Sequence, residues 1–318
     1  MSLQKYQTDH LGHPFEQMTF QFSNDYEGEV VATLVRRKSE QPTQKAVLYI
    51  HGFVDYFFQT EMAERFNTAG FHFYALDLRK YGRSHRPHQK WYNMHALNEY
   101  DAEIRAALNQ IQAEGNQQVV LAGHSTGGLI VTSFSARYPE HALVKAIWAN
   151  SPFYNFNMPK LKRSLALPHL VKLGHYLPDL EFPSSLNRWY VTSLHHSLKG
   201  EWDFNLDWKK KTMPWVRLSF IRAIYLAQEP IYKGLSLPVP ALIMHATRTT
   251  NPRRWGKDAQ SSDIILDVKD IVKETQKMQG DIELYAVEDG LHDLVLSRKD
   301  VREQVYQKLF AWLDSKLN

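Results

Sequence analysis

The sequence GHSTG, residues 123–127, places one serine between two glycines where the hydrophobic pattern changes. An apolar run from Val119 ends at Gly123, and a helical pattern begins directly after Ser125. In the pattern Gly-x-Ser-x-Gly, a sharp strand-to-helix turn exposes the serine hydroxyl, and glycines avoid a collision in that turn. The helix N-terminus behind the serine favours developing negative charge. Ser125 is therefore a candidate nucleophile with Gly123 and Gly127 in supporting positions, and the alternative is an ordinary serine N-cap.

A serine hydroxyl is a weak nucleophile and needs a neighbouring base. Among fifteen histidines, His292 in EDGLHDLVLS lies just after the last predicted strand and before the last predicted helix. Loops at the carboxyl ends of strands are where ligand chemistry takes place in open α/β sheets. The order Ser125 then His292 also fits enzymes whose catalytic residues follow the order serine, acid, histidine. We therefore predict that His292 is the base rather than a solvated loop histidine.

The acid is expected between these two residues, after the strand that ends near Ala246, where it would orient the imidazole and stabilise the imidazolium. The candidates are Asp258, Asp263 and Asp267. Asp263, in SSDIILDV, lies where a polar loop meets an apolar stretch, as expected of a part-buried carboxylate. Asp267 is better placed to cap the helix DVKDIVKETQKM. Asp263 is the preferred acid, and the other two candidates stay open.

Negative charge on a reacting carbonyl oxygen requires backbone N–H donors, one of which should follow the nucleophile, at Thr126. The second donor should come from the loop after the first central strand, HGFVDYFFQ. His51 and Gly52 follow that strand directly, and the glycine allows the turn that would direct the Phe53 N–H to the site. We predict Phe53 and Thr126 as the two donors, although a plain glycine turn with a packed phenylalanine is the alternative.

A central sheet must position these residues. Two alternating segments, residues 17–22 and 29–37, predict an antiparallel strand pair. Unbroken apolar runs predict strands buried on both faces at residues 46–50, 71–77, 118–123, 145–150, 240–246 and 282–287. Helical patterns fill most of the gaps between these runs, so the alternation predicts an α/β fold with a mostly parallel sheet flanked by helices.

One region interrupts the alternation of strands and helices. From Phe153 to about Lys233 the sequence contains short aromatic and leucine-rich pieces without a strand-helix rhythm. These pieces predict a mainly helical insertion between two strands of the sheet. The predicted organisation is a core of residues 1–152 and 234–318 and a helical cap, or lid, of residues 153–233.

The composition restricts the class of protein. Of the 318 residues 43% are hydrophobic and 23% are charged, which favours a globular chain, and the net charge of +4 gives no case for nucleic acid. The absence of cysteine excludes a disulfide framework, a thiolate metal site and a cysteine nucleophile. We find no apolar stretch of signal-peptide or membrane-span length, and we expect a soluble, cytoplasmic protein.

Four segments, YIHGF, LDLRKYGRS, AGHSTGG and DGLHDL, resemble the α/β-hydrolase superfamily in their order and spacing. Within it they are most similar to monoacylglycerol lipases, lysophospholipases and serine aminopeptidase-type hydrolases. The resemblance implies an α/β-hydrolase fold with a cap and hydrolysis of a carboxylic ester through an acyl-enzyme, without a cofactor. By this resemblance, Ser125 and His292 would be the catalytic serine and histidine, and the amides of Phe53 and Thr126 would be the oxyanion donors. The loop before Asp263 is longer than in relatives, although DIIL resembles their Asp-x-Val-Val.

The predicted cap provides the substrate clues. Its aromatic and leucine residues suit an acyl chain. Its basic clusters, Lys160, Lys162 and Arg163 and then Lys209–Lys211, suit a phosphate head group or a transient membrane contact. The expected substrate is a small ester or monoacyl lipid. An aminopeptidase or amidase would need an acidic group in the cap, for which Glu181 and Glu201 are available. A non-catalytic binding protein on the same fold is a further alternative.

No metal site is expected. His195 and His196 are adjacent, and neighbouring side chains on a helix or strand should point apart, with no further ligands at metal spacing. The sequence leaves the oligomeric state and the acyl-chain length open.

Overall fold

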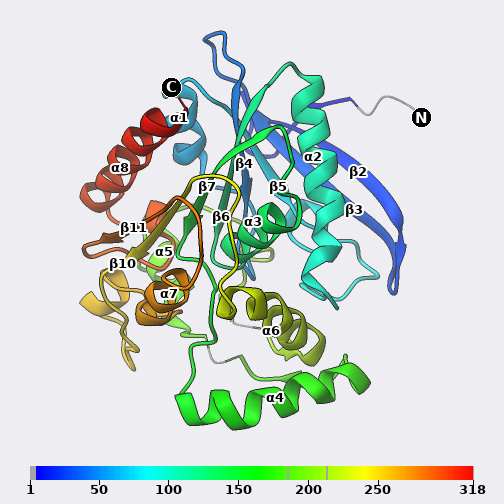
Figure 1. Cartoon of the computed structure of the whole chain (residues 1–318), viewed down its shortest axis with the longest axis vertical. Coiled ribbons are helices and arrows are strands. Elements are labelled where there is room, and N and C mark those ends of the chain that lie inside the picture. Colours follow the sequence, from blue (N-terminus) through cyan, green and yellow to red (C-terminus); the bar gives the residue numbers. More distant parts are fainter. Residues whose placement is uncertain (1–4, 185, 213, 318) are drawn as a thin grey trace.

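The computed structural model describes residues 5–184, 186–212 and 214–317, and its centre is a nine-stranded sheet (Figure 1). The strand order is β1-β2-β3-β5-β4-β6-β7-β10-β11. The strands are β1 (Gln7–Thr8), β2 (Glu16–Asp25), β3 (Gly28–Arg37), β4 (Lys45–Ile50), β5 (His72–Asp77), β6 (Gln118–His124), β7 (Val144–Asn150), β10 (Ala241–Ala246) and β11 (Ile282–Val287).

Strand direction follows the hydrophobic patterns. The alternating segments form β2 and β3, which pair antiparallel, and β3 pairs antiparallel with β5. The apolar runs form β5, β4, β6, β7, β10 and β11, which pair parallel with one another in this order. Most residues of the central strands are buried because helices cover both faces of the sheet. The predicted α/β fold with a mostly parallel sheet is confirmed.

The covering helices come from the gaps between the strands. They are α1 (Thr60–Thr68), α2 (Asp101–Ala113), α3 (Thr126–Arg137), α7 (Val268–Thr275) and α8 (Lys299–Leu317). Helices α1 and α8 pack together, with the rings of Phe66 and Phe310 centred 5.2 Å apart, and they lie across the sheet from α2 and α3 (Figure 1). Within the described residues no helix combines the length and apolar character needed to cross a membrane.

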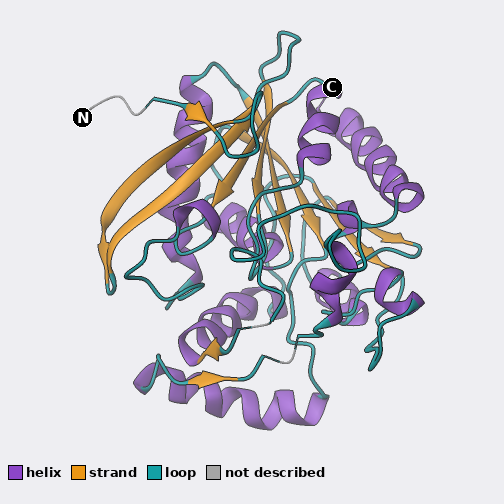
Figure 2. Cartoon of the chain, turned by 180° about the vertical axis from the view of Figure 1, so that it is seen from behind, coloured by secondary structure: helices purple, strands orange, loops and turns teal. Residues whose placement is uncertain are grey.

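The chain between β7 and β10, which we call the insertion (residues 151–240), carries α4 (Lys160–Tyr176), β8 (Glu181–Phe182), α5 (Trp189–Leu194), β9 (Val216–Arg217) and α6 (Leu218–Tyr232). Helix α4 is the outermost helix, at the end of the molecule opposite the two termini (Figure 1). Figure 2 shows the small β8–β9 ladder beside it, separate from the large sheet. Division into a core and a cap of residues 153–233 stays a prediction.

A buried ionic cluster fixes the loops at the end of β5. Asp77, the last residue of β5, accepts a hydrogen bond from the Phe57 N–H at 2.9 Å and contacts the Arg83 guanidinium at 2.8 Å. Arg83 also donates to Asp9 through Nε at 2.7 Å, and all three charged side chains are almost fully buried. The cluster therefore holds the loop after β4, which contains Phe57, against the end of β5.

We predict that Arg83→Met lowers the free energy of unfolding by about 3–5 kcal/mol, because it leaves two buried carboxylates without their cation. Urea denaturation measures this loss. The control is Arg298→Met, which removes an exposed ion pair with Asp289 and Asp300 and should cost at most about 1 kcal/mol. Equal losses for the two variants would contradict this account of the cluster.

Candidate active site

Ser125 lies at the corner between β6 and α3 in a conformation that few residues adopt. Its φ is 54° and its ψ is −114°, and a positive φ is uncommon for a residue other than glycine. It occupies the N-cap position of α3, but its side chain makes no capping hydrogen bond. The Ser125 N–H donates to the Asn150 carbonyl at 2.9 Å, and its own carbonyl accepts from the Phe153 N–H. The strained turn is thus held by its neighbours on both sides.

The glycines of the motif are required by space rather than by their backbone angles. A Cβ on Gly127 would lie 2.1 Å from the Ile50 carbonyl oxygen and 2.6 Å from that of His51. A Cβ on Gly123 would lie 2.3 Å from the Gly127 carbonyl oxygen. The first turn of α3 therefore packs directly against the backbone at the end of β4.

The structure brings three predicted side chains into one hydrogen-bonded chain. The Ser125 Oγ lies 3.0 Å from His292 Nε2, and His292 Nδ1 lies 2.8 Å from Asp263 Oδ2. Ser125 is 7% exposed, His292 2% and Asp263 0%, so these three hydrogen-bonded side chains are shielded from water. With Nδ1–H donating to the carboxylate, Nε2 is left as an acceptor that faces the serine hydroxyl.

The long loop before Asp263 closes on itself, which explains how the acid reaches the sheet. The Thr250 N–H donates to the Asp263 carbonyl at 3.1 Å, and the Asp263 N–H donates to the Arg248 carbonyl at 3.1 Å. Asp263 Oδ1 accepts the N–H groups of Ile265 and Leu266, both at 2.8 Å, which fixes the carboxylate. These hydrogen bonds hold the two ends of the loop together, and they place Asp263 beside the residues that follow β10.

The other two acid candidates have different partners. Asp258 is exposed and pairs with Arg248 at 2.9 Å. Asp267 is the N-cap of α7 and accepts the Lys269 N–H at 3.0 Å, the capping role expected for it. Of the three candidates, Asp263 is the one in contact with His292.

Burial and charge act in opposite directions on the pKa of His292. Burial lowers the pKa of His292 below its ordinary value of 6.5, and the Asp263 carboxylate opposes this effect without cancelling it. His292 is consequently neutral at neutral pH, which is the form that accepts a proton.

Both residues predicted as oxyanion donors line the cavity beside the serine. Thr126 is the first residue of α3, where a backbone N–H has no partner within the helix. Phe53 lines the same cavity, from the loop after β4. The next residue, Val54, has a φ of 53°, a strained conformation for a β-branched residue that costs about 1–3 kcal/mol.

His51 and Gly52 connect this loop to the sheet. The Nδ1–H of His51 donates to the Gly52 carbonyl at 2.8 Å, and its Nε2 accepts the Leu78 N–H at 3.1 Å. Burial lowers the pKa of His51, in keeping with this neutral tautomer. A Cβ on Gly52 would lie 3.2 Å from the Ser125 Cβ, so the loop approaches the serine closely.

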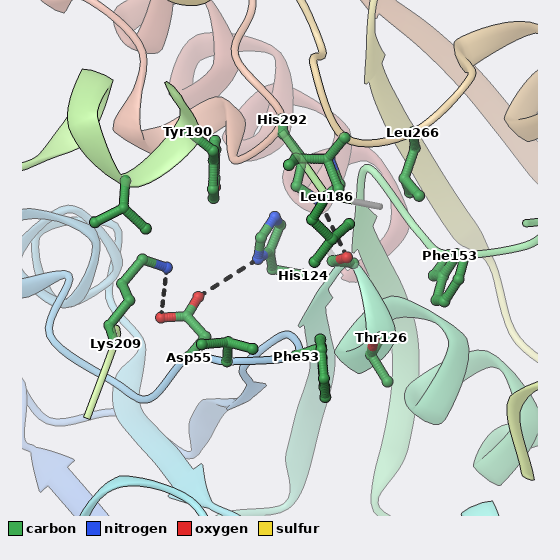
Figure 3. A pocket seen from close by; sticks show the side chains of 14 residues that line it. Phe53, Asp55, His124, Thr126, Phe153, Leu186, Tyr190, Lys209, Leu266 and His292 are labelled. Atoms are coloured by element: carbon green, nitrogen blue, oxygen red, sulfur yellow. Dashed lines mark hydrogen bonds and ion pairs between the residues drawn. The ribbon is translucent and has the colours of Figure 1, made fainter. Parts of the chain in front are cut away.

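A small cavity of about 60 Å³ lies beside Ser125 and His292 (Figure 3). Its lining is mainly apolar, and the insertion supplies Phe153, Leu186, Tyr190, Val191 and Lys209. The rest of the chain supplies Phe53, Val54, Asp55, His124, Thr126, Ile265 and Leu266 in addition to the serine and the histidine. A wider groove of about 630 Å³ shares Phe153, Leu186, Ile265 and Leu266 with this cavity. The cavity and the groove therefore adjoin at these four residues, and α4 lines the groove with Lys160 and Arg163.

One end of the cavity carries charges that the sequence analysis missed. Lys209 Nζ lies 2.8 Å from Asp55 Oδ1, and His124 Nδ1 lies 3.7 Å from Asp55 Oδ2 (Figure 3). Asp55 is 1% exposed; burial alone would raise its pKa, but the Lys209 ammonium holds that pKa at about 2. Asp55 follows a strand end and His124 lies within the serine motif, so both were detectable. Nothing in the triplet Lys209–Lys211 marked its first member as buried.

The expectation that His195 and His196 point apart is wrong. His195 ends α5 with extended backbone, so the two rings stack with centroids 4.7 Å apart and both approach Asp203. His195 Nδ1 already accepts from Ser197, and its Nε2 donates to the Phe204 carbonyl, so neither nitrogen is free to bind a metal.

A second group of potential metal ligands consists of Asp55, His124 and Asp293. The Lys209 ammonium already neutralises the Asp55 carboxylate of this group.

Comparisons with known proteins agree with this architecture. Residues 41–293 match the model of a hydrolase family described as serine aminopeptidase, S33. The chain has the α/β-hydrolase fold, with the serine corner after β6. It belongs to the serine aminopeptidase S33 family.

Among solved structures, the chain is similar to a monoacylglycerol lipase of Paleococcus ferrophilus, with a TM-score of 0.66 and 18% identity over 89% of this chain and 99% of that one. It is also similar to a soluble variant of monoglyceride lipase from Saccharomyces cerevisiae in complex with a substrate analogue. That TM-score is 0.67, at 16% identity over 99% of this chain and 96% of the other. At these identities the likeness shows the fold.

Among curated proteins, epoxide hydrolase 4 of Mus musculus is 34% identical over 107 residues, which are 33% of this chain and 28% of the mouse protein. The human protein of the same name is 30% identical over 131 residues, 41% of this chain and 34% of that protein. The match thus spans about a third or less of the curated relatives' length.

We predict that Gly127→Ala lowers the free energy of unfolding by about 3 kcal/mol, because its Cβ meets two backbone carbonyl oxygens that cannot rotate away. Thermal and urea denaturation measure the loss. Gly256→Ala is the matched control, since a Cβ there meets nothing within 4 Å. If the two variants are equally stable, α3 does not pack against β4 as described.

Proposed function

We propose that this protein is a serine hydrolase that cleaves carboxylic esters through an acyl-enzyme. The observation that carries the proposal is the buried chain from the Ser125 hydroxyl through His292 to Asp263, with separations of 3.0 and 2.8 Å. A hydroxyl in hydrogen-bond contact with a neutral, oriented imidazole is the arrangement that activates a serine nucleophile.

In the proposed reaction, Ser125 Oγ attacks the ester carbonyl carbon while its proton passes to His292 Nε2. Asp263 holds the Nδ1–H and stabilises the imidazolium, and the N–H groups of Phe53 and Thr126 stabilise the negative oxygen. The C–O bond then breaks, and the alcohol leaves with the proton from His292. Water, deprotonated by His292, attacks the acyl-serine, which releases the acid and restores Ser125.

The lining of the cavity supports a small ester or a monoacyl lipid as the substrate, as in a carboxylesterase or a monoacylglycerol lipase. The inner cavity would hold the part next to the reacting carbonyl, and the wider groove would hold the rest. A preference for lysophospholipids has less support, because two of the cations on which it rested are already paired. Arg163 forms an ion pair with Asp270, and Lys209 forms one with Asp55.

The aminopeptidase or amidase alternative has less support for the same reason. Glu181 pairs with Arg217 and Glu201 pairs with Arg302, and neither glutamate lines the cavity. In the inner cavity a substrate ammonium would meet Asp55, whose charge Lys209 already balances. We further propose that residues 153–233 act as a cap over a core of residues 1–152 and 234–318.

We predict that Ser125→Ala lowers kcat for p-nitrophenyl butyrate by about 10⁴- to 10⁶-fold, since members of a triad act as a unit. It should also abolish labelling by a fluorophosphonate. Ser164→Ala, which changes an exposed serine on α4, is the control and should retain both. A folded wild-type protein that neither reacts with the probe nor hydrolyses esters would instead be a binding protein.

The pH dependence should report the buried base. Only neutral His292 accepts the serine proton, and burial lowers its pKa, so the active form should persist below pH 6.5. We predict that kcat/KM for p-nitrophenyl butyrate falls on acidification with a midpoint below pH 6.5. A midpoint above 6.5 would mean that Asp263 outweighs burial in the free enzyme.

A further inference from the structure

The loop after β4 holds the proposed oxyanion donor Phe53 in a conformation that the loop cannot maintain alone. Val54 has a φ of 53° and is 3% exposed, so a β-branched residue is buried in the left-handed region. Such conformations persist only where the surrounding structure determines them. The contacts that hold this loop therefore decide where the Phe53 N–H points.

The core anchors one side of the strained residues. The Gly52 carbonyl accepts a hydrogen bond from His51 Nδ1 at 2.8 Å, and His51 is itself bound to the Leu78 N–H. The two residues that follow, Phe53 and Val54, lead directly to Asp55. Their backbone is consequently fixed only if Asp55 is also fixed.

The insertion supplies that second anchor. We call residues 204–209, which lie against the loop after β4, the anchor segment. Lys209 Nζ lies 2.8 Å from Asp55 Oδ1, and the Asn205 N–H donates to the Tyr56 hydroxyl at 2.7 Å. The ring of Phe204 also packs on the ring of Phe58, with centroids 4.7 Å apart.

The ion pair between Lys209 and Asp55 is sealed from solvent. The two residues are 2% and 1% exposed, and the Lys209 ammonium lies 5.4 Å from the centre of the Phe58 ring and 5.5 Å from that of Tyr190. Asp55 Oδ1 also accepts the Tyr56 N–H at 2.9 Å. Because both partners are buried, removing one of them leaves an uncompensated buried charge, which is costly.

We propose that Lys209 is a positioning residue through which the insertion completes the oxyanion hole. By holding Asp55, Lys209 keeps Val54 at its positive φ and directs the Phe53 N–H to the oxygen of the reacting carbonyl. Lys209 acts through Asp55 and does not touch the reacting atoms. This inference rests on the proposed ester hydrolysis, in which Phe53 is one of two donors.

The test compares Lys209→Met, which keeps the aliphatic stem, with the control Lys210→Met, whose ammonium lies over Trp91 outside the cavity. Active sites are counted with a fluorophosphonate, and p-nitrophenyl butyrate is the substrate. For Lys209→Met we expect kcat to fall by about 10- to 100-fold with KM within two-fold, somewhat less than the loss of a whole oxyanion donor. Affinity for a trifluoromethyl ketone, which forms an oxyanion on Ser125, should fall by the same factor.

The double variant Asp55→Asn with Lys209→Met separates positioning from stability, because it removes both buried charges together. We expect its melting temperature to recover towards the wild-type value while kcat stays low. Recovery of kcat along with stability would overturn the proposal, as would an unchanged kcat per titrated site in Lys209→Met. A wild-type protein without ester hydrolysis or labelling would instead refute the proposed function, so the two failures are distinguishable.

Discussion

The close approach of α3 to the end of β4 is the constraint on which the rest of the site depends. Gly127 lies so near the Ile50 carbonyl oxygen that no side chain fits between them. The N-terminus of α3 is therefore brought next to the loop that carries Phe53. The same corner gives Ser125 its positive φ, and its hydroxyl faces His292 instead of capping the helix. In a relaxed turn the same residues would not converge.

The parts of this arrangement that depend on local sequence were predictable. The strands, the serine corner and the position of His292 follow from apolar runs, glycine spacing and chain order, which all act over short stretches. Asp263 was harder to choose among three aspartates because the loop before it is long. The hydrogen bonds that pinch this loop join Arg248 and Thr250 to Asp263, and such pairing across a loop leaves little trace in a single sequence.

The parts that depend on distant contacts were not predictable. The triplet Lys209–Lys211 has the pattern of a solvated face, yet its first lysine is buried because Asp55, far away in the sequence, offers a carboxylate there. The rings of His195 and His196 were expected to point apart, as they would within a helix or a strand. The backbone instead changes from helical to extended at His195, where α5 ends, and both rings approach Asp203. Burial of a charge is a property of two segments, and neither segment alone reveals it.

The insertion contacts His292 as well as the loop after β4. The ring of Tyr190, on α5, lies 5.6 Å from the ring of His292, which is 2% exposed. Burial is the main influence that lowers the pKa of this histidine, and Asp263 acts against it. A core without the insertion would leave the imidazole hydrated, and Asp263 would then raise its pKa with little opposition. The residues between β7 and β10 therefore contribute, through Tyr190, to the burial that lowers the pKa of His292.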